Sequence, residues 1–142
     1  MSEKVLMVDD EKEFLEIMSE RMKARDINVT TATSADQALE IIENESFDAI
    51  ILDFMMPGMD GMDALKVIKA KKPEAQIILL TGYATVEKSV EAMKIGATDF
   101  IEKPVDLAVL AEKIKNAKAE KMLIVEKQTE DKVKNILKKY GF

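Results

Sequence analysis

The sequence predicts an α/β protein built around a parallel β-sheet. Short apolar runs alternate along the chain with longer segments whose apolar residues recur at helical spacing, and this order is typical of a parallel sheet covered by helices. Three of the five runs are continuously apolar, as expected for strands that are buried on both faces. The 142 residues, of which 47% are hydrophobic, suffice for one such domain with a short extension.

Five segments are predicted to be strands. They are residues 4–8 (KVLMV), 28–32 (NVTTA), 49–52 (AIIL), 76–80 (QIILL) and 99–101 (DFI). A helical segment follows each of them, and its apolar face is predicted from residues three or four apart. These faces are Phe14, Ile17, Met18 and Met22; Ala38, Leu39, Ile41 and Ile42; Leu65 and Ile68; Val86, Val90 and Met93; and Leu107, Leu110 and Ile114. Asp10, Ser34 and Asp106 are predicted N-terminal caps.

Five consecutive β-α units predict a doubly wound, flavodoxin-like sheet with strand order 2-1-3-4-5. We expect this domain to occupy residues 1–118 and residues 119–142 to form a C-terminal helical extension or linker. The extension is rich in Lys and Glu, and we expect a helix break near residues 128–131. It is either a solvated or frayed helix, or a surface for a dimer or another partner.

The composition excludes several classes of function. The chain has no Cys and no His, so thiolate sites, disulfides and imidazole bases are excluded, and a metal would have oxygen ligands. The net charge of −6 disfavours direct nucleic-acid binding, and the Lys-rich tail contains acids and no Arg. No apolar run is long enough for a membrane span, and no signal peptide begins the chain, so we expect a cytoplasmic protein.

Polar residues follow four of the predicted strands. Asp9 and Asp10 follow the first, Asp53 the third, Thr81 the fourth and Lys103 the fifth. In an open α/β sheet, ligands bind beyond the carboxyl ends of the strands, where the strand order reverses. The first and third strands flank that point, so three carboxylates are expected to converge there.

Converging carboxylates repel each other, so a positive group must offset them. The candidates are a divalent cation and Lys103; three acids with water or carbonyl oxygens suit Mg²⁺, with Mn²⁺ as an alternative. A carboxylate beside such a cation and an ammonium could attack phosphorus and form an acyl phosphate, with the Thr81 hydroxyl bonded to a phosphoryl oxygen.

Four motifs resemble the receiver domains of two-component response regulators. They are VLMVDDE (5–11), ILDFMMPGMDGM (51–62), LLTGYA (79–84) and DFIEKPVD (99–106). The resemblance covers about residues 3–118, and residues 81–104 are similar to receivers of bacterial enhancer-binding transcription activators. It implies a phosphoprotein of a phosphorelay, in which Asp53 is the phosphoacceptor.

The resemblance also implies roles for the other site residues. Asp10 would bind Mg²⁺ directly, with help from Asp9 and the backbone carbonyl of Met55, while Thr81 and Lys103 would contact the phosphoryl group. The bond between Lys103 and Pro104 would be cis.

Further implied roles concern switching and lifetime. Phe100 would be the aromatic switch residue, and the fourth helix, fifth strand and fifth helix would form the readout face. Met55 and Tyr83 occupy positions that tune hydrolysis of the acyl phosphate, and neither is an acid or an amide that could position water. We therefore expect slow self-dephosphorylation.

The partners implied are a histidine kinase or a phosphotransfer protein as donor and a downstream effector as target. No output domain is encoded in these residues, so the chain is either a free-standing receiver or a piece of a larger regulator. A homodimer through the readout face or the C-terminal helix is a further expectation.

Two other functions were weighed. A phosphatase with an Asp nucleophile would carry a DxD motif after the first strand, whereas this chain has DDE there and no insertion for a substrate cap. A receiver-like scaffold that never uses phosphate would usually lack one of the key residues, and all of them are present.

Four methionines cluster after Asp53, at Met55, Met56, Met59 and Met62. They are interpreted either as gap-filling core residues or as a pliable docking surface.

Overall fold

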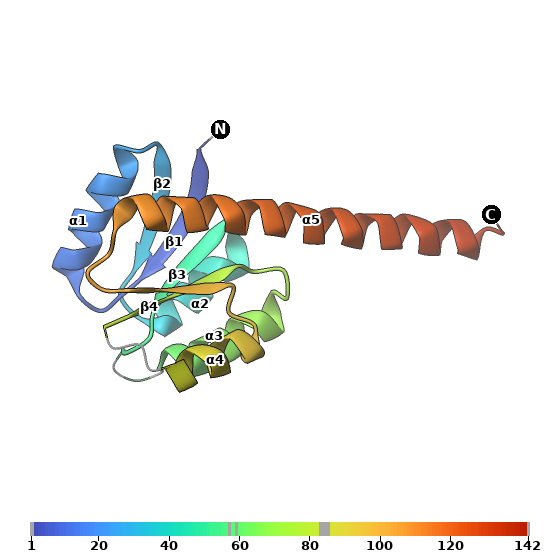
Figure 1. Ribbon diagram of the computed structural model, residues 1–142. Coiled ribbons are helices and arrows are strands. Elements are labelled where there is room, and N and C mark those ends of the chain that lie inside the picture. The colour runs from blue at the N-terminus through green and yellow to red at the C-terminus, as the bar shows by residue number, and fades with distance from the viewer. Residues whose placement is uncertain (1, 57, 59, 83–85, 142) are drawn as a thin grey trace.

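The computed structural model describes residues 2–56, 58, 60–82 and 86–141. Within these residues the strands form one parallel sheet of five, in the order β2-β1-β3-β4-β5 (Figure 1). The predicted fold class and strand order are therefore confirmed. The strands are β1 (Glu3–Val8), β2 (Ile27–Ala32), β3 (Ala49–Asp53), β4 (Ile77–Thr81) and β5 (Asp99–Glu102).

Helices cover both faces of the sheet. They are α1 (Lys12–Lys23), α2 (Ala35–Asn44), α3 (Gly61–Lys71), α4 (Val86–Ile95) and α5 (Leu107–Lys139). Helices α1 and α5 share one apolar cluster with the sheet, and α2, α3 and α4 share the other, so the molecule has three layers (Figure 1).

The two clusters explain why the strands are apolar without alternation. Successive side chains of a strand point to opposite faces, and in β1 Val5 and Met7 belong to the cluster under α1 and α5. Leu6 and Val8 belong to the cluster under α2, α3 and α4. All four side chains are fully buried, so both faces of the strand require apolar residues.

Two of the three predicted caps are confirmed. The Ser34 hydroxyl accepts a hydrogen bond from the Gln37 N–H at the start of α2, and the Asp106 carboxylate accepts from two N–H groups at the start of α5. The prediction for Asp10 is wrong, because the N-cap of α1 is Glu11, without a side-chain cap. The Glu11 N–H donates to Asp9 instead, at 2.9 Å.

The predicted apolar faces are partly wrong in α1 and α4. Ile17 is 49% exposed, and Leu15 is buried in its place. Val90 and Met93 are also exposed, whereas Ala92 between them is buried. Both helices carry apolar residues on more than one side, so spacing alone does not determine which side meets the sheet.

Helix α5 continues without a break to Lys139, so the predicted interruption near residues 128–131 is wrong. Its first part packs on the sheet through Leu110, Ile114 and Ala117, and its second part extends beyond the body of the domain (Figure 1). The second part exposes Met122, Leu123, Val125, Val133, Ile136 and Leu137, and Tyr140 just after it is exposed as well. None of the described helices is long and apolar enough to cross a membrane.

Candidate functional site

The register of the sheet places Asp9 beside Asp53. Strands β1 and β3 pair in parallel with Val8 opposite Leu52, and each aspartate is the next residue of its chain segment. Strand β1 also pairs with β2 on its other side, so the aspartates stand at the centre of the carboxyl edge, where the strand order reverses.

Asp10 completes an acidic cluster with these two residues. One carboxylate oxygen from each of Asp9, Asp10 and Asp53 lies within 4.8 Å of the others. Asp9 is fully buried and Asp53 is 5% exposed, whereas Asp10 is exposed. Carboxylate oxygens open to solvent on one side suit a hard cation that keeps part of its water shell, as Mg²⁺ does.

Lys103 lies between the two buried carboxylates. Its Nζ donates to Asp9 Oδ2 at 3.0 Å and lies 3.8 Å from Asp53 Oδ2. The backbone holds it there, because the Lys103 N–H donates to the carbonyl of Thr81 at 2.7 Å. The Lys103–Pro104 peptide bond is cis. The carboxyl ends of β1, β3 and β5 thus each place a charged residue in one group.

Burial and neighbouring charges shift the pKa values of Asp53 and Lys103. Burial and the neighbouring Asp9 raise the pKa of Asp53 to about 6, although Lys103 and the Met55 N–H oppose the change. Partial burial lowers the pKa of Lys103, but its hydrogen bond to Asp9 and the charge of Asp53 outweigh burial and leave this pKa raised. The ammonium therefore stays charged, while Asp53 remains poorly compensated.

Thr81 carries an unsatisfied hydroxyl at the same edge. It is the last residue of β4 and is 6% exposed. Its Oγ1 is buried and has no hydrogen-bond partner within the described part of the chain. Because an unpaired buried hydroxyl is costly, this atom suits a ligand oxygen brought to the carboxyl edge.

The remaining residues predicted for the site are Phe100, Met55 and Tyr83. Phe100 is half-buried and packs against the apolar cluster under α2, α3 and α4. The Met55 side chain is 71% exposed, while its N–H donates to Asp53 Oδ1 at 3.3 Å. Tyr83 lies outside the described residues.

Sequence reasoning missed two residues beside the site. Gly61 has no role in the sequence prediction, yet a Cβ at this position would lie 2.6 Å from Phe54 Cα and 2.9 Å from the Asp53 carbonyl oxygen. The start of α3 therefore approaches the loop after Asp53 too closely for a side chain. Phe14 was assigned to the core, but its ring centroid lies 4.6 Å from Lys103 Nζ. The amphipathic pattern of α1 gave no signal for that contact.

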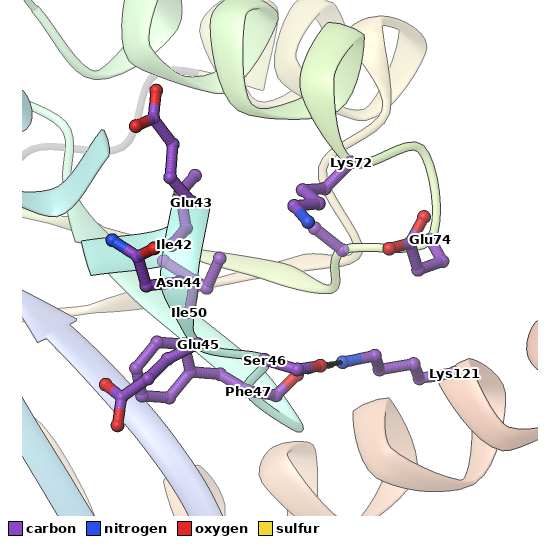
Figure 2. Close-up of a pocket in the computed structure, with 11 residues that line it drawn as sticks. Ile42, Glu43, Asn44, Glu45, Ser46, Phe47, Ile50, Lys72, Glu74 and Lys121 are labelled. Carbon is purple, nitrogen blue, oxygen red and sulfur yellow. Dashed lines mark hydrogen bonds between the residues drawn. The ribbon is translucent and has the colours of Figure 1, made fainter. Parts of the chain in front are cut away.

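A cavity of about 210 Å³ occupies the opposite, amino edge of the sheet. Figure 2 shows Lys121 of α5 reaching the segment between α2 and β3, where its Nζ donates to Ser46 Oγ and the Phe47 carbonyl, each at 2.6 Å. Acids and lysines are scattered around the cavity rather than converging on one point. The lining of this cavity therefore contains no cluster of charged residues comparable to that of the carboxyl edge.

The sequence matches the family model described as response regulator receiver domain over residues 5–115. The chain belongs to this family. The receiver is homologous to receivers of enhancer-binding regulators. It is 37% identical over 115 residues to the transcriptional regulatory protein ZraR of Escherichia coli, covering 81% of this chain and 26% of ZraR.

Two further relatives agree with this assignment. The receiver is 36% identical over 110 residues to the response regulator protein FleR of Pseudomonas aeruginosa, covering 78% of this chain and 23% of FleR. A crystal structure of a receiver domain protein from Clostridium thermocellum aligns with a TM-score of 0.81 at 36% identity, covering 87% of this chain and 99% of that one. This chain thus spans about a quarter of the curated relatives' length.

Proposed function

We propose that this receiver accepts a phosphoryl group on Asp53, with Mg²⁺ bound, and changes shape in response. The observation that supports this most is the convergence of three carboxylates and Lys103 at one edge of the sheet. The fold itself does not require such a cluster, and the charges of Asp9 and Asp53 are poorly solvated there.

Asp9, Asp10 and Asp53 would hold Mg²⁺, or Mn²⁺ in its place, together with the Met55 carbonyl and water. A bound cation would offset the negative charge of the phosphoryl oxygens. The donor set supports this assignment, since it consists of oxygen atoms and includes one exposed acid that leaves access to solvent.

The reaction is a single displacement at phosphorus. An oxygen of the ionised Asp53 carboxylate attacks, a P–O bond forms, and the P–N bond of a phosphohistidine donor breaks with its electron pair going to the imidazole. Lys103 would pair with a phosphoryl oxygen as it now pairs with Asp9. The Thr81 hydroxyl would donate to another, and thereby gain the partner that it lacks among the described residues.

Thr81 and Phe100 would then transmit the change. Movement of Thr81 toward the phosphoryl group would vacate space near β5, and the half-buried Phe100 would turn inward. The surface of α4, β5 and α5 would change with it, shifting the population between two states.

A histidine kinase or a phosphotransfer protein would be the donor, and a downstream effector the target, consistent with relatives that are transcriptional regulators. Residues 1–118 would form the receiver unit and residues 119–142 a helical extension or linker, in a cytoplasmic protein without direct nucleic-acid contact. Because α5 is one continuous helix, it would couple the receiver to whatever the extension binds.

A homodimer would cover apolar surface through the α4-β5-α5 face or through the C-terminal part of α5. Ile136 is 57% and Met93 44% exposed, and a projecting helix with such residues gains stability by packing against another. In multi-angle light scattering of the phosphorylated protein, Ile136→Glu would yield monomer if the helix is the interface, and Met93→Glu if the readout face is. If neither variant changes the mass, a dimer through these faces is wrong.

The test of the proposed function is intact-mass analysis after incubation with acetyl phosphate and Mg²⁺. We expect the wild type to gain one phosphoryl group, and both Asp53→Asn and the wild type with chelator to gain none. An unlabelled wild type, or an Asp53→Asn variant labelled to the same extent, would contradict the proposal. Steady turnover of phosphate esters would instead indicate a phosphatase.

A further inference from the structure

We propose that Phe14 is a positioning residue: its ring holds the Lys103 ammonium in place for phosphoryl transfer, an inference that rests on the proposed function. The Phe14 centroid lies 4.6 Å from Lys103 Nζ, within the range in which the negative face of an aromatic ring attracts a cation. The same nitrogen lies 3.0 Å from Asp9 Oδ2 and 3.8 Å from Asp53 Oδ2. The ring and the two carboxylates thus surround the ammonium.

Lys103 needs such a restraint. A lysine side chain has a flexible four-carbon stem, and that of Lys103 remains 22% exposed, so solvent competes for its ammonium. In the proposed reaction the ammonium must contact a phosphoryl oxygen while Asp9 serves the metal. The ion pair with Asp9 therefore weakens when Lys103 is most needed, whereas contact with a neutral ring persists.

An aromatic ring suits this task better than an acid would. A carboxylate in its place would form an ion pair with Lys103 and compete with the phosphoryl oxygens. The ring attracts the charge through its quadrupole without occupying an N–H donor in a strong hydrogen bond. Lys103 can thus be held within the site and still have its donors free for substrate.

Phe14 is itself well fixed. It lies in the first turn of α1 and packs against the apolar cluster beneath α1 and α5. The Glu11 N–H just before this turn donates to Asp9 Oδ1 at 2.9 Å. One short segment therefore positions both the ring and the carboxylate that contact Lys103.

The experiment must separate attraction by the ring from simple packing. Fluorinated phenylalanines at position 14 weaken the ring quadrupole stepwise while they keep nearly the same shape. Phe47 provides a matched control, because Lys4 Nζ lies 5.2 Å from its ring and Phe47 lines the cavity at the opposite edge of the sheet (Figure 2). The measured quantity is the rate of acetyl-phosphate labelling with Mg²⁺ at saturation.

We expect the rate to fall with each fluorine at position 14, by about three- to tenfold for the trifluorinated ring. The same series at position 47 should leave the rate unchanged, and the position 14 series should lose its effect in a Lys103→Met background. Phe14→Leu should be slow and Phe14→Tyr close to the wild type.

If the wild type is labelled but the labelling rate does not change with fluorination at position 14, the positioning role is overturned and the proposed function stays intact. If fluorination at position 14 slows labelling equally in the Lys103→Met background, the positioning role is overturned as well, because the effect would then not act through Lys103. A wild type that takes no label at all overturns both proposals.

Discussion

The two edges of the sheet each hold a partly buried lysine, and the ammonium groups of the two lysines have different kinds of partner. At the carboxyl edge, Lys103 lies between the carboxylates of Asp9 and Asp53. At the amino edge, Lys121 donates to two neutral oxygens, of Ser46 and Phe47, and burial lowers its pKa. One lysine offsets an excess of negative charge, and the other anchors a helix to a loop.

The difference shows where the fold tolerates unsatisfied groups. Thr81 Oγ1 has no partner among the described residues, and the pKa of Asp53 is raised to about 6, so the carboxyl edge is electrostatically incomplete. The Asp48 segment at the amino edge is well bonded, since Asp48 and Lys4 exchange two hydrogen bonds. Such unsatisfied groups agree with the proposed function, in which a cation and a phosphoryl group would bind at this edge.

The largest expected effect is that of replacing Lys103 by methionine, with Lys121 replaced in a separate control variant. Lys103→Met removes the cation that would stabilise the phosphoryl oxygens, so we expect acetyl-phosphate labelling to slow by about 10²- to 10³-fold. Lys121→Met, the matched variant at the amino edge, should leave the labelling rate unchanged and lower the free energy of unfolding by about 1 kcal/mol. Equal labelling rates in the two variants would remove the distinction between the edges.

The next effect concerns stability and its dependence on pH. The pKa of Asp53 in the folded protein, about 6, lies above the value of 3.8 for an unperturbed carboxyl, so the folded state retains a proton that the unfolded state loses as the pH rises. Ionisation of Asp53 therefore destabilises the fold increasingly from about pH 4 to pH 6 and constantly above that.

Asp53→Asn should consequently raise the free energy of unfolding by about 3 kcal/mol at pH 7.5 without Mg²⁺, and by only about 0.5 kcal/mol at pH 4. Urea titrations at both pH values measure this difference. Asp48→Asn is the control at the amino edge, where loss of a charge-assisted bond with the Lys4 N–H should lower stability slightly. If Asp53→Asn is destabilising at pH 7.5, the carboxyl edge is not strained as described.

The smallest expected effect concerns the lifetime of the acyl phosphate. The exposed side chain of Met55 lies two residues after Asp53 and cannot orient water for hydrolysis. Met55→Asn supplies an amide at this position, so we expect the phosphorylated state to decay severalfold faster after removal of the donor. A longer lifetime in the variant would show that Met55 does not shield the acyl phosphate.

The strand order and the position of the aspartates were predictable because a parallel sheet brings carboxyl ends together whatever the side chains are. Two other features depend on tertiary placement. Ile17 and Leu15 compete for the buried side of α1, and apolar spacing does not distinguish them. The polar residues 128–131 suggested a break in α5, yet they are acceptable in a helix that is exposed all round.

The contact between Phe14 and Lys103 illustrates a different limit. The two residues lie at opposite ends of the domain's sequence, and each has an adequate local role, in an amphipathic helix and in a strand-end motif. Only the packing of α1 beside the carboxyl edge reveals that they meet. Likewise, the close approach at Gly61 depends on how α3 returns to the loop after Asp53.

Chemical trapping of the phosphorylated residue tests the central claim most directly. Borohydride reduces an acyl phosphate to an alcohol with release of phosphate, so an aspartyl phosphate becomes homoserine and can be located by peptide mass spectrometry. After treatment with acetyl phosphate and Mg²⁺, we expect homoserine at position 53, and none when Mg²⁺ is chelated. Homoserine at another aspartate, or at none in a labelled protein, would contradict the assignment of Asp53 as phosphoacceptor.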